Sequence, residues 1–285
     1  MSTTQQPATA FHAAQQYQSK YLTANGLKTH YIEAGSGNPV VLLHGGGAGA
    51  DCRSNWFKTI PQFANRFHVY AIDLLGFGHT DRPDPAGFAY TQDARNDHMV
   101  AAIEALGVGP VNMVGNSMGG ATTIGVAVKR PDLVKKAVLM GAAGISSGPM
   151  SPALGAIVNY DFTREGMVKV CQVLANASFD IDPDMVDYRL GLSIDPATRA
   201  AYSATMGWVK QQGGLHYEHD FIRQVKVPSL VVNGKDDKVV PLANALKFLE
   251  LIADSWGYII PHCGHWAMLE YPDDFAGEVT RFLTA

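Results

Sequence analysis

The chain has 285 residues, of which 47% are hydrophobic and 17% charged, and its formal net charge is −4. This composition excludes an intrinsically disordered chain, and the weak negative charge offers no attraction for nucleic acid or an anionic membrane surface. No apolar run approaches the roughly 18 residues that are needed to span a bilayer.

The elements expected along the chain alternate between strands and helices. Short apolar runs predict strands at Lys28–Ala34, Pro39–Leu43, Phe67–Asp73, Val111–Gly115, Val134–Met140, Leu230–Asn233 and Gly257–Pro261. Helical patterns between most of them predict helices at Thr91–Leu106, Gly119–Lys129, Leu242–Ile252 and Asp273–Leu283. This alternation is typical of βαβ units, so we expect an α/β fold with a mostly parallel central sheet flanked by helices.

One segment, from about Ser146 to Phe221, contains no convincing parallel strand and is rich in Met and aromatic residues. We interpret it as a helical lid over the carboxyl ends of the strands, where open α/β sheets bind ligands. The expected organisation is therefore a first core part (1–145), the lid (146–221) and a second core part (222–285). The alternative is that this segment simply continues the doubly wound fold.

The cysteines and the N-terminal residues indicate the cellular compartment of the protein. Cys52, Cys171 and Cys263 are far apart, so no disulfide framework or CxxC zinc site is expected, and we predict a reducing, cytoplasmic setting. Residues 1–16 lack the charged and apolar segments of a signal peptide. They are expected to form either a loose arm or a packing strap.

The strongest motif is G-N-S-M-G at residues 115–119. It matches G-x-S-x-G, follows a predicted strand and opens a predicted helix, which is the context that a nucleophile elbow requires. A sharp strand-to-helix turn would hold Ser117 in a strained backbone conformation and present its hydroxyl above the sheet. We expect Ser117 to be the nucleophile.

A serine hydroxyl needs a base and an acid to activate it, in the chain order Ser, acid, His in this fold. After the strand at Leu230–Asn233, both Asp236 and Asp237 are candidates for the acid, and the usual spacing of this loop favours Asp237. After the last strand, His265 is favoured as the base over His262, because it follows a glycine and precedes the final helix.

A tetrahedral intermediate also needs hydrogen-bond donors for its oxyanion. The backbone N–H of Met118, directly after the nucleophile, is one candidate. The other comes from the glycine-rich loop at residues 44–47, where we favour Gly46. His44 is expected to brace this turn rather than to act in catalysis. A phosphate-binding loop is disfavoured because no GK[ST] follows the glycines.

Together these stretches resemble the α/β-hydrolases over nearly the whole chain. More narrowly, the chain resembles the meta-cleavage product hydrolases of aromatic degradation, in particular the biphenyl, carbazole and dibenzofuran type. The stretches that carry the resemblance are residues 44–50, 115–122, 139–141, 234–241 and 263–266.

The resemblance implies cleavage of a C–C bond in 2-hydroxy-6-oxo-6-aryl-hexa-2,4-dienoates, giving 2-hydroxypenta-2,4-dienoate and an aromatic carboxylic acid. It implies a homo-oligomer, a dimer or higher, that needs no metal or organic cofactor and takes a small anionic dienoate as its only partner. Ser117, His265 and Asp237 fall on the family's catalytic set. The expected substrate-binding residues are Gly45, Asn55, Asn116, Arg189 and Trp266.

A planar guanidinium such as that of Arg189 suits the carboxylate of such a substrate. One departure is Val239, which stands where some family members carry an aromatic residue. The pocket for the distal ring is therefore expected to differ in shape. The residues expected to line it are Ile145, Leu154, Ile157, Phe179, Trp208 and Val239.

Three other functions are weighed against this one. A carboxylesterase or lactonase would use the same triad, but a simple ester needs no carboxylate pocket built from Asn116, Arg189 and Trp266. A dehalogenase or epoxide hydrolase would carry Asp at the elbow, where this chain has Ser117. A non-catalytic, receptor-like binder on the same fold is compatible with an intact triad.

Overall fold

The computed structural model describes residues 11, 17–146, 148 and 150–285. Within these ranges a single sheet runs in the order β1-β2-β4-β3-β5-β6-β7-β8. β1 (Ser19–Ala24) and β4 (Phe67–Ile72) both pair antiparallel with β2 (Leu27–Gly35). The other strands run parallel to β4: β3 (Asn38–Leu43), β5 (Val111–Asn116), β6 (Val134–Met140), β7 (Ser229–Gly234) and β8 (Ser255–Ile260). The expected α/β fold with a mostly parallel sheet is confirmed.

Strand β1 lies outside the expected elements. It is joined to β2 by Asn25 and Gly26, whose φ angles are 50° and 75°. Positive φ at both central residues is the requirement of a tight two-residue hairpin turn, and Asn-Gly is the pair that best tolerates it. The inner strands follow a different rule, which β3 shows: its four buried positions, residues 40–43, are all apolar.

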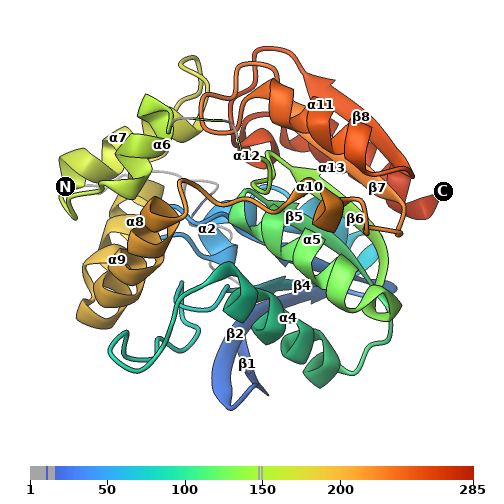
Figure 1. The fold of residues 1–285 in the computed structure, drawn as a ribbon, viewed down its shortest axis with the longest axis horizontal. Helices are drawn as coiled ribbons and strands as arrows, with labels where there is room; N and C mark the ends of the chain where they lie inside the picture. The colour runs from blue at the N-terminus through green and yellow to red at the C-terminus, as the bar shows by residue number, and fades with distance from the viewer. Residues whose placement is uncertain (1–10, 12–16, 147, 149) are drawn as a thin grey trace, which may run out of the picture.

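Helices cover both faces of the sheet (Figure 1). One face carries α4 (Gln92–Leu106), α5 (Met118–Lys129) and α11 (Leu242–Leu251), and a short 3₁₀ turn, η2 (Pro131–Leu133), leads into β6. The other face carries α2 (Cys52–Trp56), α3 (Ile60–Ala64), α12 (Ala267–Glu270) and α13 (Pro272–Thr284). Trp56 and Phe275 stack between α2 and α13, with ring centroids 6.2 Å apart.

Between β6 and β7, a group of helices lies together at one end of the sheet (Figure 1). They are α6 (Pro152–Val158), α7 (Arg164–Leu174), α8 (Pro183–Ile194) and α9 (Pro196–Gln211), followed by α10 (His219–Ile222). Pro152, Pro183 and Pro196 each begin a helix, where the missing proline N–H leaves no hydrogen bond unmade. We call α6–α9 the lid helices, and all of them fall inside the predicted range 146–221.

Three further findings bear on the remaining expectations from the sequence. Among the described residues, no helix has both the length and the apolar character needed to cross a bilayer. The three cysteines are buried and unbridged. The predicted arm at residues 1–16 lies outside the described residues except for Phe11, which is 1% exposed.

Candidate active site

Ser117 occupies the turn between β5 and α5. Its φ of 55° and ψ of −115° are angles that residues with a side chain rarely adopt. The turn is tight because a Cβ at Gly115 would meet the backbone of Gly119, and a Cβ at Gly119 would meet the carbonyl group of Leu43. The Ser117 amide donates to the Met140 carbonyl over 3.1 Å. The motif therefore forms the strained strand–turn–helix expected of a nucleophile elbow.

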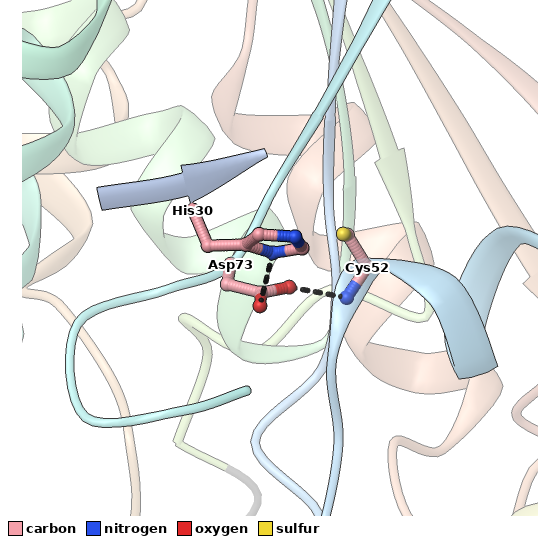
Figure 2. A group of neighbouring side chains, drawn as sticks. All are labelled: His30, Cys52 and Asp73. Atoms are coloured by element: carbon pink, nitrogen blue, oxygen red, sulfur yellow. Dashed lines mark hydrogen bonds and ion pairs between the residues drawn. The ribbon is translucent and has the colours of Figure 1, made fainter. Parts of the chain in front are cut away.

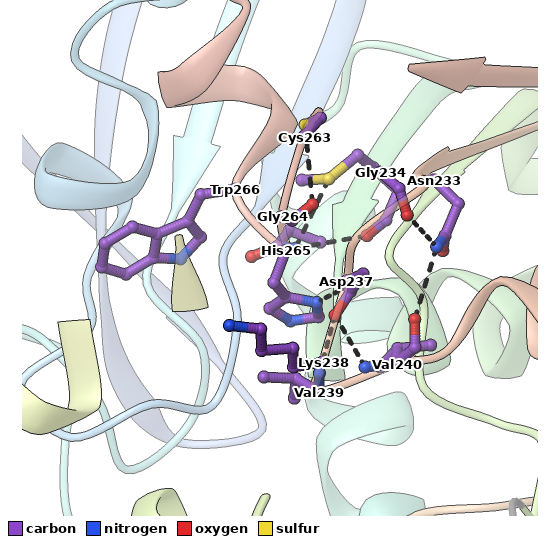
Figure 3. Close-up of polar contacts among 12 residues, drawn as sticks. Asn233, Gly234, Asp237, Lys238, Val239, Val240, Cys263, Gly264, His265 and Trp266 are labelled. Atoms are coloured by element: carbon purple, nitrogen blue, oxygen red, sulfur yellow. Dashed lines mark hydrogen bonds and ion pairs between the residues drawn. The ribbon is translucent and has the colours of Figure 1, made fainter. Parts of the chain in front are cut away.

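His265 and Asp237 form a buried pair (Figure 3). Nδ1 of His265 lies 2.7 Å from Oδ2 of Asp237. Oδ1 of the same carboxylate accepts hydrogen bonds from the amides of Val239 and Val240, each over 2.8 Å. The carboxylate therefore keeps the proton of a neutral ring on Nδ1 and leaves Nε2 as the acceptor. Nε2 is buried and has no hydrogen-bond partner among the described residues.

The competing candidates lie outside this pair. Asp236 and His262 are both exposed. The Asp236 carboxylate accepts instead from the side chain of Asn176, over 3.2 Å. The structure thus brings Asp237, not Asp236, against His265, in agreement with the loop spacing.

Gly141 and Glu270, which no motif assigned to the site, help to place His265. Gly141 follows β6 with a φ of 49°, and a Cβ there would lie 2.9 Å from Nδ1 of His265. Glu270 accepts hydrogen bonds from the amides on both sides of the histidine, Gly264 over 2.9 Å and Trp266 over 3.1 Å. The sequence could have indicated Gly141, because it directly follows a parallel strand. It could not have indicated Glu270, because a glutamate near a helix is common.

The glycine-rich loop after β3 lies against the elbow. A Cβ at Gly45 would lie 3.2 Å from Cβ of Ser117, and one at Gly46 would lie 2.9 Å from Sδ of Met118. A larger residue at either position would have to displace the side chains of Asn116 or Met118. This close approach brings the two expected oxyanion donors, Gly46 and Met118, to the same wall of the site.

His44 braces this loop, as expected. Its Nε2 accepts from the amide of Leu74 over 2.9 Å, and its Nδ1 lies 2.7 Å from the carbonyl oxygen of Gly45. The ring is fully buried, and burial lowers the pKa of His44 below its usual value. It therefore acts as a neutral brace between the ends of β3 and β4.

A cavity that is partly open to solvent lies between the elbow and the lid helices, and its empty volume of about 550 Å³ includes some of that open solvent. Every candidate site residue lines it except Asp237, which is reached only through its bond to His265. Its polar wall contains Gly45, Gly46, Asn55, Asn116, Ser117, Arg189, His265 and Trp266. Its apolar wall contains Leu154, Ile157, Val158, Met206, Val209, Leu215 and Val239.

Arg189 projects into this cavity from α8 and is 1% exposed. Its Nη2 donates to the carbonyl group of Ala48 over 2.9 Å, and its guanidinium lies 5.4 Å from the ring centroid of Trp266. Within the described part of the chain, its Nε and Nη1 have no partner, and neither does Nδ2 of Asn55. A buried cation with unsatisfied donors is costly unless an anion completes it. The cavity is therefore complementary to an anionic ligand.

Three expected lining residues do not line the cavity. Phe179 lies under the ammonium group of Lys58, 4.8 Å from ring centroid to Nζ, and borders two other pockets. Ile145 borders a neighbouring pocket. Trp208 lies on α9 next to Val209, which does line the cavity. The expectation is wrong for these residues because apolar character alone does not reveal whether a side chain faces the cavity.

Comparison with known proteins supports one family. Residues 38–272 match the family model for the alpha/beta hydrolase fold. Over 269 residues the chain is 53% identical to a 2-hydroxy-6-oxo-6-(2'-aminophenyl)hexa-2,4-dienoic acid hydrolase from Metapseudomonas resinovorans, with 94% of this chain and 91% of the relative covered.

Two solved structures agree with this. A serine hydrolase involved in carbazole degradation, the CarC enzyme, superposes with a TM-score of 0.87 at 52% identity, covering 94% of this chain and 99% of that one. A variant of CumD, a meta-cleavage product hydrolase, superposes with a TM-score of 0.86 at 31% identity, covering 93% and 97%. The chain belongs to the α/β-hydrolase fold family and, within it, to the meta-cleavage product hydrolases.

Proposed function

We propose that the protein hydrolyses the C–C bond between C5 and C6 of 2-hydroxy-6-oxo-6-aryl-hexa-2,4-dienoates in the degradation of aromatic compounds. The products are 2-hydroxypenta-2,4-dienoate and an aromatic carboxylic acid. The observation that carries this proposal is the buried guanidinium of Arg189, with its unpaired donors, in the same cavity as Ser117 and His265. A simple ester offers no carboxylate to satisfy that charge.

The substrate carboxylate is proposed to bind Arg189 and Asn116, with Asn55 and Trp266 completing the polar wall and Gly45 contacting the substrate. Charge-assisted hydrogen bonds from a guanidinium are well suited to a carboxylate. Because the net charge of −4 gives no long-range attraction for an anion, these local donors supply it. The aryl group at C6 then faces the apolar wall formed by the lid helices.

The first chemical step is a proton transfer to carbon, with His265 as the shuttle, that converts the dienolate into its keto tautomer. This step is required because the carbon released by cleavage must leave as a stabilised dienolate rather than as a bare carbanion. The free, buried Nε2 of His265 is the nitrogen available for this transfer.

In the second step Ser117, losing its proton to His265, bonds to the C6 ketone, and the oxyanion is stabilised by the N–H groups of Gly46 and Met118. The C5–C6 bond then breaks, its electron pair passes into the departing dienolate, and the acyl group stays on Ser117. Water releases the acid and restores the serine. Asp237 keeps His265 in its working tautomer and stabilises the imidazolium.

The relatives support this substrate class. The 53%-identical relative is named for a 6-(2'-aminophenyl) dienoate, and a 31%-identical relative from Pseudomonas sp. (strain CF600) is named 2-hydroxymuconate semialdehyde hydrolase. From the family resemblance and the low charged fraction of 17%, we also propose a homo-oligomer that acts in the cytoplasm.

The test is product analysis with the 6-phenyl dienoate. We expect the coloured dienolate to disappear and benzoate and 2-hydroxypenta-2,4-dienoate to form in equal amounts. A p-nitrophenyl ester is assayed in parallel. Efficient ester hydrolysis without any loss of the dienolate would reject the proposal in favour of a carboxylesterase or lactonase.

A further inference from the structure

The lid contacts the core at the residue next to Arg189. The hydroxyl of Tyr188, on α8, donates a hydrogen bond to Oδ2 of Asp51 over 2.6 Å. Asp51 is fully buried and directly follows the glycine-rich loop that faces the elbow. Burial and the nearby Asp51 carboxylate raise the pKa of Tyr188, so its hydroxyl keeps its proton and remains a donor. This bond joins the lid to the loop that carries the oxyanion donor.

Asp51 is held in place from the core side. Its Oδ1 caps α2 by accepting from the amide of Ser54 over 2.7 Å. The next amide, of Cys52, donates to Oδ1 of Asp73 over 2.7 Å, and Oδ2 of Asp73 lies 2.7 Å from Nδ1 of His30 (Figure 2). Burial alone would raise the pKa of Asp73, but the hydrogen bond and charge of His30 keep it well below its usual value. The segment that bears Asp51 is thus fixed to a buried hydrogen-bonded pair, His30 and Asp73.

The side chains of His30, Cys52 and Asp73 are of types that bind metal ions, and they lie close together. The polar atoms of His30 and Asp73 are already engaged, however. Nε2 of His30 lies 2.9 Å from Oγ of Ser19, and Oδ2 of Asp73 also accepts from the amide of His79 over 2.8 Å. A metal ion would have to displace these bonds, so the group is better explained as a support for the Asp51 segment.

On the lid side, the contact at Tyr188 continues into Arg189. Arg189 donates to the carbonyl group of Ala48, and a Cβ at Gly49 would meet the backbone carbonyl of Arg189. The ring of Phe11 packs edge-on against Tyr188, with centroids 5.1 Å apart. Successive helical residues point about 100° apart, so Tyr188 can anchor α8 to the core while Arg189 points into the cavity.

We propose that the Tyr188–Asp51 hydrogen bond is a latch that sets the position of the Arg189 guanidinium, so that Tyr188 and Asp51 are positioning residues for substrates that carry a carboxylate. The inference rests on the proposed function, in which Arg189 binds the substrate carboxylate. A latch of this kind controls binding of the anion at one end of the substrate and leaves the rest of the cavity unchanged.

The test measures dissociation constants of the 6-phenyl dienoate in a Ser117→Ala background, where the ligand is not consumed. A hydrogen bond to a charged group is strong, so Tyr188→Phe should weaken dienoate binding about tenfold. Binding of the C1 methyl ester of the same compound, which lacks the carboxylate, should stay within about twofold. Asp51→Asn should act like Tyr188→Phe, because asparagine still caps α2 but offers Tyr188 no carboxylate.

Tyr160→Phe is the matched control. Tyr160 also loses hydroxyl contacts in this variant, but its partners are the carbonyl oxygen of Thr163, over 3.3 Å, and Oγ of Ser193, 3.0 Å away, both within the lid. We expect Tyr160→Phe to bind both ligands like the Ser117→Ala parent. The double variant Tyr188→Phe with Asp51→Asn should bind the dienoate no more weakly than either single variant, since both changes abolish the same charge-assisted hydrogen bond.

The latch is rejected if Tyr188→Phe weakens acid and ester equally, if it weakens neither, or if the effects of the two substitutions add. A failure of the proposed function gives a different result, because the Ser117→Ala parent would then not bind the dienoate at all.

Discussion

At the scale of single residues, the orientation of His265 depends on one carboxylate. Asn at position 237 can still accept the amide bonds of Val239 and Val240, but an NH₂ group facing the ring favours the wrong tautomer. We expect Asp237→Asn to lower kcat on the 6-phenyl dienoate by about 10³- to 10⁴-fold. Asp236→Asn, the exposed neighbour, should leave kcat unchanged. Equal losses of kcat in the two variants would show that Asp237 does not orient His265.

Gly141 gives a second prediction at this scale. Its φ of 49° and the 2.9 Å approach of a Cβ to Nδ1 of His265 mean that Gly141→Ala should displace the catalytic ring and lower kcat at least tenfold. Gly107 is the control, because its φ of 66° imposes similar backbone strain but no atom lies within 4 Å of its Cβ position. Gly107→Ala should cost about 1 kcal/mol of unfolding free energy and leave kcat unchanged. Normal turnover by Gly141→Ala would show that the ring tolerates the methyl group.

At the scale of elements, Glu270 joins the start of α12 to the lid. It accepts from the amides of Gly264 and Trp266 and also from Asn176, just beyond α7, over 2.9 Å. Removing these bonds leaves partly buried amides unpaired, so Glu270→Ala should lower the free energy of unfolding by about 2–3 kcal/mol and reduce kcat as the His265 loop loosens.

Urea unfolding and steady-state kinetics check this prediction. Glu278→Ala is the comparison, since among the described residues Glu278 forms its ion pair with an exposed residue, Arg281, and such pairs contribute little. If the two variants lose the same stability, Glu270 does not hold the loop.

The elements show what the sequence could and could not predict. The parallel strands, the elbow and the order Ser117, Asp237, His265 were readable, because buried strands are continuous apolar runs and the motifs are local in the chain. β1 could have been predicted from Asn25 and Gly26, because this pair indicates a hairpin turn. The lining residues of the lid were only partly readable: Leu154 and Ile157 do line the cavity, but Trp208 does not, whereas its neighbour Val209 does. A lid helix packs apolar side chains both toward the cavity and against its neighbours.

At the scale of the whole molecule, buried histidines set the response of stability to acid. His98 contacts Oγ1 of Thr29 over 2.9 Å, and burial lowers the pKa of His98 from 6.5 to about 4. Below pH 6.5 the unfolded chain gains a proton at this residue, whereas the folded chain does so only near pH 4. The stability that neutral His98 contributes is therefore complete above pH 6.5 and is lost as the pH falls toward 4.

From this shift we expect the free energy of unfolding to fall by about 2 kcal/mol between pH 7 and pH 5 through His98 alone. Urea unfolding of the unchanged protein and of His98→Asn at both pH values isolates this contribution. The loss between the two pH values should be smaller in His98→Asn by that amount. Identical losses would mean that His98 is protonated in the folded state.

The central claim is that Ser117 forms a bond to the C6 ketone, and the Ser117→Ala variant tests it most directly. The measurement is the absorbance of the 6-phenyl dienolate mixed with an excess of this variant, followed beside benzoate release. We predict that the ligand binds and keeps its chromophore, as enol or keto tautomer, while no benzoate forms. Benzoate release near the rate of the unchanged protein would contradict the account.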